Sequence, residues 1–165
     1  MIFVTVGAQM PFDRLVRKVD QWAAGCAGKN SVFAQIGETR WRPGHMQWTP
    51  VLRPTDFRHR LYEADAVVTH AGMGTILTAL EFGKPVVVMP RRGDLLETRN
   101  DHQLATAAAF ADAGLVSVAW NEIELPDALE RLDGAIAPRR AGSHASLRLL
   151  ETLHGFIHGD TVRRP

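Results

Sequence analysis

The chain has 165 residues, 45% of them hydrophobic and 22% charged, which is the size and composition of one soluble globular domain. Its 19 Lys and Arg residues and 18 Asp and Glu residues give a formal net charge of +1, so its charge does not indicate binding to nucleic acid or to an anionic membrane. The single cysteine excludes a disulfide within the chain, and the start of the sequence lacks the basic segment of a signal peptide, so we expect a cytoplasmic protein.

Short apolar runs alternate along the sequence with segments of helical periodicity. The first run, residues 2–6, is β-branched and ends at Gly7, and a segment with apolar residues at helical spacing follows it. The predicted strands are 2–6, 32–37, 47–52, 66–70, 86–90 and 115–119. The predicted helices are 12–24, 56–63 with Asp56 as N-cap, the segment after Thr75 up to Phe82, 100–113, 124–132 and 143–158.

This alternation predicts an α/β fold with a doubly wound, parallel, six-stranded sheet of the Rossmann type. We expect one domain over residues 1–159 and a frayed tail at 160–165. In the strand order 3-2-1-4-5-6 the winding reverses between the first and fourth strands, and ligands bind beyond the carboxyl ends of the strands at that point. Those ends carry Gly7 and residues 70–75, which therefore form the expected binding site.

A glycine-containing turn at residues 70–75 joins a buried strand to a helix. Glycine lets the backbone approach a ligand closely, and the free N–H groups and positive end of the helix suit a phosphate group. The third glycine of the dinucleotide motif is missing, since Leu77 stands in its place, and no Walker lysine follows. A tight turn without a ligand is the alternative interpretation. The candidate phosphate-binding residues are Gly7, Gly72, Met73, Gly74 and Thr75.

Three motifs in this order resemble the C-terminal half of a GT-B glycosyltransferase, and most closely glycosyltransferase family 28. They are His70-Ala71-Gly72-Met73-Gly74-Thr75, Gly83-Lys84-Pro85 and Asn100-Asp101-His102-Gln103. The N-terminal Val4-Thr5-Val6-Gly7, followed by Phe12-Asp13, is similar to short stand-alone catalytic subunits of the family. Some of these subunits act in chitobiosyl-lipid synthesis and others in bacterial exopolysaccharide assembly. The resemblance covers roughly residues 1–120.

The resemblance implies that the chain binds a UDP-sugar donor and transfers its sugar with inversion, without a cofactor. The turn would hold the diphosphate, with His70 as a positioning residue that is either a neutral donor or a cation. Thr78 stands where the family often has an acidic residue that contacts the ribose, so only a weaker hydroxyl contact is implied. No Asp-x-Asp motif is present, so the sequence requires no metal ion, and it does not identify the general base.

The resemblance also implies that His102 and Gln103 bind the sugar hydroxyls, with Asn100 beside them and either Asn100 or Asp101 capping the helix. Their side chains can both donate and accept hydrogen bonds, as a polyhydroxyl ligand requires.

Arg91 and Arg92 directly follow the fifth predicted strand. Their guanidinium groups would select a uronic acid by its carboxylate, or they would form a solvated pair neutralised by the loop charges Asp94 and Glu97.

The resemblance implies that the two-domain relatives carry the acceptor site and the general base on the half that this sequence lacks. We therefore expect the chain to transfer sugar only with a membrane-associated partner subunit that presents a lipid-linked glycan acceptor and recruits the chain to the inner face of the membrane. We expect no nucleic-acid partner. The alternative is a non-catalytic nucleotide-sugar-binding or scaffold module. A nucleotide-sugar epimerase is a third interpretation, and the sequence disfavours it because such an enzyme would need both domains in one chain.

Overall fold

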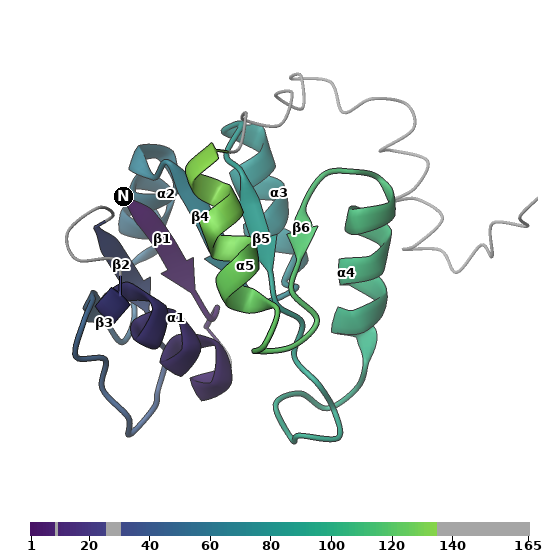
Figure 1. The fold of residues 1–165 in the computed structure, drawn as a ribbon, viewed down its shortest axis with the longest axis horizontal. Coiled ribbons are helices and arrows are strands. Elements are labelled where there is room, and N and C mark those ends of the chain that lie inside the picture. Colours follow the sequence, from purple (N-terminus) through teal and green to yellow (C-terminus); the bar gives the residue numbers. More distant parts are fainter. Residues whose placement is uncertain (9, 26–30, 135–165) are drawn as a thin grey trace, which may run out of the picture.

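A parallel sheet lies between two layers of helices in the computed structural model, which describes residues 1–8, 10–25 and 31–134 (Figure 1). The strands are β1 Ile2–Thr5, β2 Val32–Gln35, β3 Gln47–Thr49, β4 Ala66–Thr69, β5 Val86–Val88 and β6 Ser117–Val118. The helices are α1 Asp13–Gly25, α2 Pro54–Glu63, α3 Met73–Glu81, α4 His102–Asp112 and α5 Leu125–Glu130, followed by a 3-10 helix at Arg131–Gly134.

The strand order β3-β2-β1-β4-β5-β6, with every neighbouring pair parallel, confirms the predicted topology. The central strands β1, β4 and β5 are buried along their whole length, because helices cover both faces of the sheet. β1 and β4 pair in level register, from Ile2 opposite Ala66 to Thr5 opposite Thr69. The segments that follow these two strands therefore leave the sheet side by side at its carboxyl edge.

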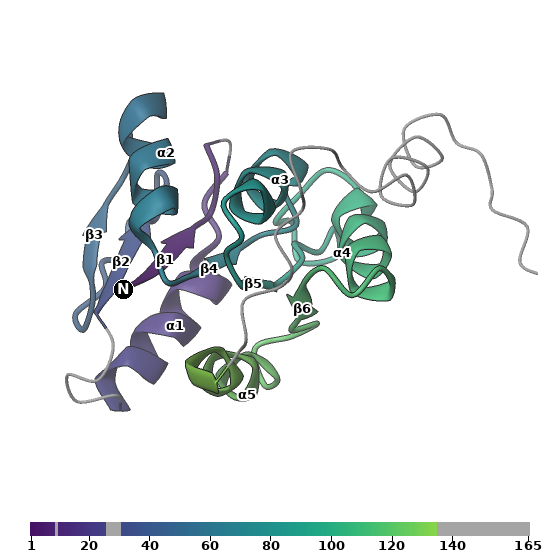
Figure 2. The ribbon, with the colours of Figure 1, turned by 90° about the horizontal axis from the view of Figure 1, so that it is seen from above.

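Each face of the sheet has its own apolar core. Helices α1 and α5 cover one face, and α2, α3 and α4 cover the other (Figure 2). β1 shows how the sequence sets this division, since Ile2 and Val4 pack with the α1 and α5 layer while Phe3 packs on the opposite side. This alternation follows from the two-residue period of a strand.

Three helix starts differ from the prediction. α3 begins at Met73 rather than after Thr75, so Gly74 and Thr75 lie in its first turn and not in the loop before it. α2 begins at Pro54, with Arg53 as the N-cap residue, and Asp56 lies in the first turn, where its carboxylate accepts a hydrogen bond from Arg53 Nε at 2.9 Å. The predicted cap at Asp56 is wrong because proline is preorganised for the first helical position. α4 begins at His102 rather than residue 100.

Helix formation in the last part of the chain was predicted in two places. The helix predicted at 124–132 is confirmed by α5 and the 3-10 helix after it. The helix predicted at 143–158, and the tail at 160–165, lie outside the described residues. No helix within the described ranges has the length and apolarity that a membrane crossing requires.

Candidate functional site

The imidazole ring of His70 lies against two glycines that are far apart in the sequence. A Cβ atom built at Gly7 would stand 2.6 Å from His70 Cε1, and one at Gly72 would stand 2.2 Å from His70 Nε2. Gly7 also has a φ of +75°, which side chains rarely adopt. The two glycines are thus required by the packing of His70 at the end of β4, whether or not a ligand binds.

Gly74 has no such internal cause. A Cβ atom there would meet nothing within 4 Å, and its φ is not in the left-handed region. Glycine in a helix costs about 1 kcal/mol relative to alanine. The N-cap residue of α3, Gly72, has no side chain to cap the helix, so the N–H groups of the first turn lack a side-chain partner from it. The predicted phosphate-binding residues therefore meet at an open helix start with free space beside it.

A pocket of about 90 Å³ lies at the carboxyl edge of the sheet, to which the strand arrows point in Figure 1. The β1–α1 loop, the end of β4, the β5–α4 loop and the start of α4 all contribute to it. Its lining residues are Val6, Ala8, Met10, His70, Arg91, Glu97, Thr98 and Gln103. The fold thus brings three predicted site residues, His70, Arg91 and Gln103, to one cavity at the switch point between β1 and β4.

His70 is neutral at pH 7. Burial, and then the positive charge of Arg91, lower its pKa to about 4, although a hydrogen bond with the Thr5 backbone acts in the opposite direction. Its Nδ1 atom lies 3.3 Å from the hydroxyl oxygen of Thr69. Of the two states considered for His70, the neutral donor or acceptor agrees with the structure.

Gln103 connects the ends of two strands to the start of α4. Its Oε1 atom accepts hydrogen bonds from the backbone N–H groups of Ala71, at 3.2 Å, and Arg91, at 3.1 Å. These bonds use both lone pairs of the oxygen, so the amide nitrogen is the part of Gln103 available to a sugar hydroxyl.

The other residues predicted at the start of α4 lie outside the lining of the pocket. Asp101 is the N-cap residue of α4 but makes no side-chain cap hydrogen bond, and the Oδ1 atom of Asn100, one residue earlier, accepts a hydrogen bond from the His102 N–H at 3.3 Å. Asp101 instead accepts from the Gly93 N–H at 3.0 Å and so fixes the β5–α4 loop. His102 is exposed.

Thr78 uses its hydroxyl proton within α3. The hydroxyl donates to the Gly74 carbonyl at 2.8 Å, the usual bond of threonine to the fourth residue before it. If Thr78 contacts a ribose, its hydroxyl oxygen can therefore only accept a hydrogen bond from it.

Arg91 is 4% exposed, and its two terminal nitrogens donate to four backbone carbonyls. The acceptors are Val6 at 2.7 Å, Met10 at 2.6 Å, Pro11 at 2.7 Å and Glu97 at 3.1 Å. The expectation that Arg91 recognises a sugar carboxylate with its fork is wrong, because these donors already have partners.

Arg92 is exposed and paired with a neighbour in its own loop. It donates to both carboxylate oxygens of Asp94, at 3.0 and 2.6 Å, and this hydrogen bonding lowers the pKa of Asp94. The solvated pair, which was the alternative for this position, agrees with the structure.

Glu97 is a site residue that the sequence did not indicate. Its side chain is only 13% exposed, and its two oxygens accept from Arg14 Nε and Nη2, each at 2.8 Å. Arg14 also donates to Glu122 at 2.9 Å. The prediction of a solvated Glu97 is therefore wrong. No local pattern could have revealed this pair, since 83 residues separate Arg14 from Glu97.

Residues 1–142 match the glycosyltransferase family 28 C-terminal domain. The chain belongs to this family. Among family relatives, it is 32% identical over 135 residues to the UDP-N-acetylglucosamine–N-acetylmuramyl-(pentapeptide) pyrophosphoryl-undecaprenol N-acetylglucosamine transferase of Thermus thermophilus. The aligned segment covers 76% of this chain and 39% of that protein. It is 33% identical over 123 residues to the mouse UDP-N-acetylglucosamine transferase subunit ALG13, which covers 68% of this chain and 10% of that protein.

Solved structures have the same fold. The solution structure of ALG13 superposes with a TM-score of 0.62 at 21% identity, and the match covers 93% of this chain and 96% of that chain. The glycosyltransferase of kitacinnamycin gives a TM-score of 0.60 at 21% identity, with 95% of this chain covered but only 38% of the other. The family 28 chain described here thus has the architecture of one GT-B half, and it spans about two fifths of its bacterial relative.

Proposed function

We propose that the chain is the donor-binding catalytic subunit of an inverting glycosyltransferase, which transfers a sugar from a UDP-sugar to a lipid-linked acceptor in polysaccharide synthesis. The observation that carries the proposal is Gly74, a helical glycine that no packing contact explains, at the open start of α3. Space and free N–H groups at that point suit a diphosphate. Membership of family 28, whose relatives are named UDP-N-acetylglucosamine transferases, supports the same ligand class.

The transfer would be a displacement at the anomeric carbon. An acceptor hydroxyl gives its proton to a base on the partner half and forms the new bond from one side, while the bond to the UDP oxygen breaks on the other, which inverts the configuration. Charge then develops on the leaving diphosphate, where the N-terminal end of α3 stabilises it most. The neutral ring of His70 contributes a hydrogen-bonding group at this place without a positive charge.

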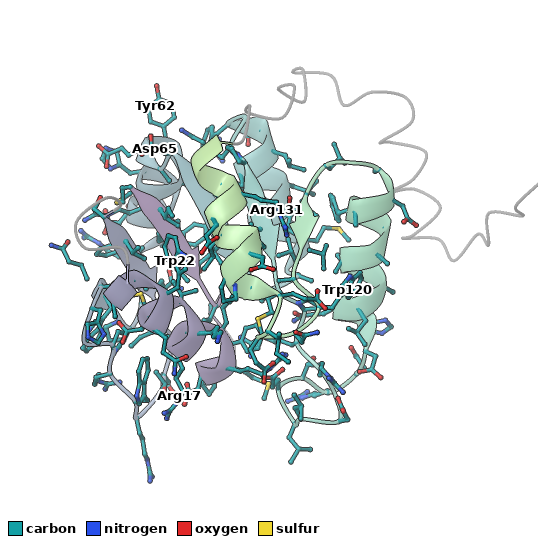
Figure 3. The ribbon with its side chains drawn as sticks, viewed as in Figure 1. Arg17, Trp22, Tyr62, Asp65, Trp120 and Arg131 are labelled. Atoms are coloured by element: carbon teal, nitrogen blue, oxygen red, sulfur yellow. The ribbon has the colours of Figure 1, made fainter. Side chains whose placement is uncertain are left out.

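A partner that supplies the acceptor half is part of the proposal, together with recruitment to the inner face of the membrane through that partner. The carboxyl edge of the sheet offers a surface to which such a partner could bind. Six of the seven exposed large apolar residues in the described part of the chain lie on loops at that edge, whereas Tyr62 lies at the opposite one, well away from Trp120 (Figure 3). Val51 follows β3 at one end of the sheet, and the other five follow β1, β5 and β6. The five are Met10, Leu95, Leu96, Trp120 and Ile123. Such a group of apolar side chains is typical of a protein interface.

A non-catalytic nucleotide-sugar-binding module is the second candidate. The observation in its favour is Thr78, whose hydroxyl proton is used inside α3 at the position of the usual ribose contact. The two candidates differ in one measurement: sugar transfer in the presence of the partner supports the catalytic subunit, and donor binding without transfer supports the module.

The donor site is tested by titrating UDP into the purified chain and its Gly74→Val variant in a calorimeter. Valine is at least as compatible with a helix as glycine, so the fold should persist while the side chain fills the diphosphate space. We expect the affinity for UDP to fall by at least about tenfold. Gly44→Val is the matched control, since a Cβ atom at Gly44 also meets nothing within 4 Å, and it should bind UDP normally. Unchanged affinity in Gly74→Val would refute this site.

A further inference from the structure

Arg91 is buried at the place where the two walls of the pocket meet. Within the described residues, none of its hydrogen-bond acceptors is a carboxylate, and all four are backbone carbonyls. Burial lowers its pKa, with the charge of Glu97 acting in the opposite direction. An apolar side chain of similar volume often stabilises a fold better than a buried charged group. Stability alone therefore does not explain an arginine at this position.

The four carbonyls belong to two different loops. Val6, Met10 and Pro11 lie in the segment between β1 and α1, while Glu97 lies in the loop between β5 and α4. These segments contribute Val6, Ala8 and Met10 on one side of the pocket and Glu97 and Thr98 on the other. One planar guanidinium group thus joins both walls, and Arg91 itself lines the cavity between them. Its Cζ atom also lies 4.9 Å from the ring centre of Phe12.

We propose that Arg91 is a positioning residue of the donor site, which holds the β1–α1 loop against the β5–α4 loop and so fixes the pocket before a ligand binds. This inference rests on the proposed function. Arginine suits the task because its N–H donors point in several directions within one rigid plane, whereas lysine has the same charge on a single nitrogen. A preformed site avoids the cost of ordering two loops during binding, which otherwise reduces affinity.

The test compares UDP binding by the full chain, by Arg91→Lys and by the control Arg53→Lys, whose side chain is 85% exposed before α2 and does not line the pocket. We expect Arg91→Lys to lower the affinity by about tenfold or more although the charge is kept, and Arg53→Lys to stay within about twofold. Wild-type affinity in a folded Arg91→Lys variant would overturn the proposal. So would a lower melting temperature without any loss of affinity, since that is the result of a purely structural role.

A second measurement uses the unaltered chain without ligand and therefore does not depend on how the variant folds. Hydrogen bonds from both terminal nitrogens restrict rotation of the guanidinium, so the Arg91 Hη protons should give separate, slowly exchanging NMR signals. One averaged signal, as for an exposed arginine, would overturn the proposal. If the unaltered chain binds no UDP, the proposed function fails, and the Hη signals still decide whether Arg91 holds the loops.

Discussion

His70 combines an unusual protonation state with unusual packing. Its pKa of about 4 means that the folded chain excludes a proton which the unfolded chain, with an ordinary pKa of 6.5, accepts. Between these two values the unfolded state binds more protons, so the free energy of unfolding decreases as the pH falls from about 6.5 to about 4. Above about pH 6.5 the ring of His70 is neutral in both the folded and the unfolded chain, so it contributes no pH dependence to the stability.

Urea denaturation at about pH 7.5 and about pH 4.5 measures this effect. We expect the chain to lose up to about 3 kcal/mol of stability through His70 between these values, as a shift of this size implies. His70→Gln keeps a polar side chain and removes the titration, so its stability should depend less on pH. An identical pH dependence in both proteins would contradict the assignment.

Gln103 should affect stability and sugar binding through different atoms. Gln103→Ala leaves two partly buried N–H groups, those of Ala71 and Arg91, without their acceptor and should lower the free energy of unfolding by about 1–3 kcal/mol. Gln103→Glu keeps an acceptor oxygen but loses the amide nitrogen. It should stay closer to the wild type in urea denaturation while binding a UDP-sugar, relative to UDP, less well. Equal losses for both ligands would place the sugar elsewhere.

At the scale of single residues, the sequence predicted the position of the site better than the contacts within it. The end of β4 and the presence of a helix after it follow from local pattern, although that helix begins inside the predicted turn, at Met73. The bonds of Arg91 to carbonyls could not be predicted, since any residue type carries a carbonyl and the acceptor Val6 is 85 positions away.

At the scale of elements, one arginine connects α1 with two loops. Arg14 pairs with the largely buried Glu97 and with Glu122, whose side chain is 48% exposed. These ion pairs bring the β5–α4 loop and the loop before α5 to the same end of α1. The loops that carry Leu96 and Ile123 are thereby held beside each other.

The two ion pairs should differ in their effect on stability. Arg14→Met leaves the buried Glu97 carboxylate without its main partner and should cost about 1–3 kcal/mol in urea denaturation. Glu122→Gln removes only the exposed partner of the same arginine and should cost less than about 1 kcal/mol. Equal losses would show that burial does not distinguish the two pairs.

Strand order was predictable from sequence, whereas the exact starts of α2, α3 and α4 were not. Continuous apolar runs and the alternation of strands with helices leave few arrangements of a parallel sheet. A helix start depends on which side chains are free to cap it, and Asp101 is not free because it binds the Gly93 N–H. Such competition between nearby acceptors is invisible in the pattern of residue types.

At the scale of the whole molecule, exposed apolar side chains lie on loops at the same edge of the sheet as the pocket. Leu96 is 85% exposed with a φ of +56°, a conformation that costs a leucine about 1 kcal/mol or more. Ile123 is 82% exposed in a turn fixed by the Asn121 side chain, which accepts from its N–H at 2.9 Å. Ordered turns thus present both side chains to the outside on the edge where the donor would bind.

A charged residue on this surface should separate partner binding from donor binding. We expect Leu96→Asp to bind UDP like the wild type, yet to fail to restore the polysaccharide synthesis proposed for this chain in cells that lack it. Val51→Asp is the control, since Val51 is 60% exposed and lies outside the apolar group at the pocket. Full restoration by Leu96→Asp would exclude Leu96 from the interface.

The contact of His70 with Gly7 and Gly72 also restricts which substitutions can occur together. The three atoms nearest to an alanine Cβ at position 72 all belong to the imidazole ring, so exchanging His70 for a small residue would remove this obstacle. An alanine at position 7 would remain strained after that exchange, because its φ of +75° does not depend on the ring. Among homologous sequences, residue 72 should therefore covary with residue 70, whereas residue 7 should remain glycine irrespective of both.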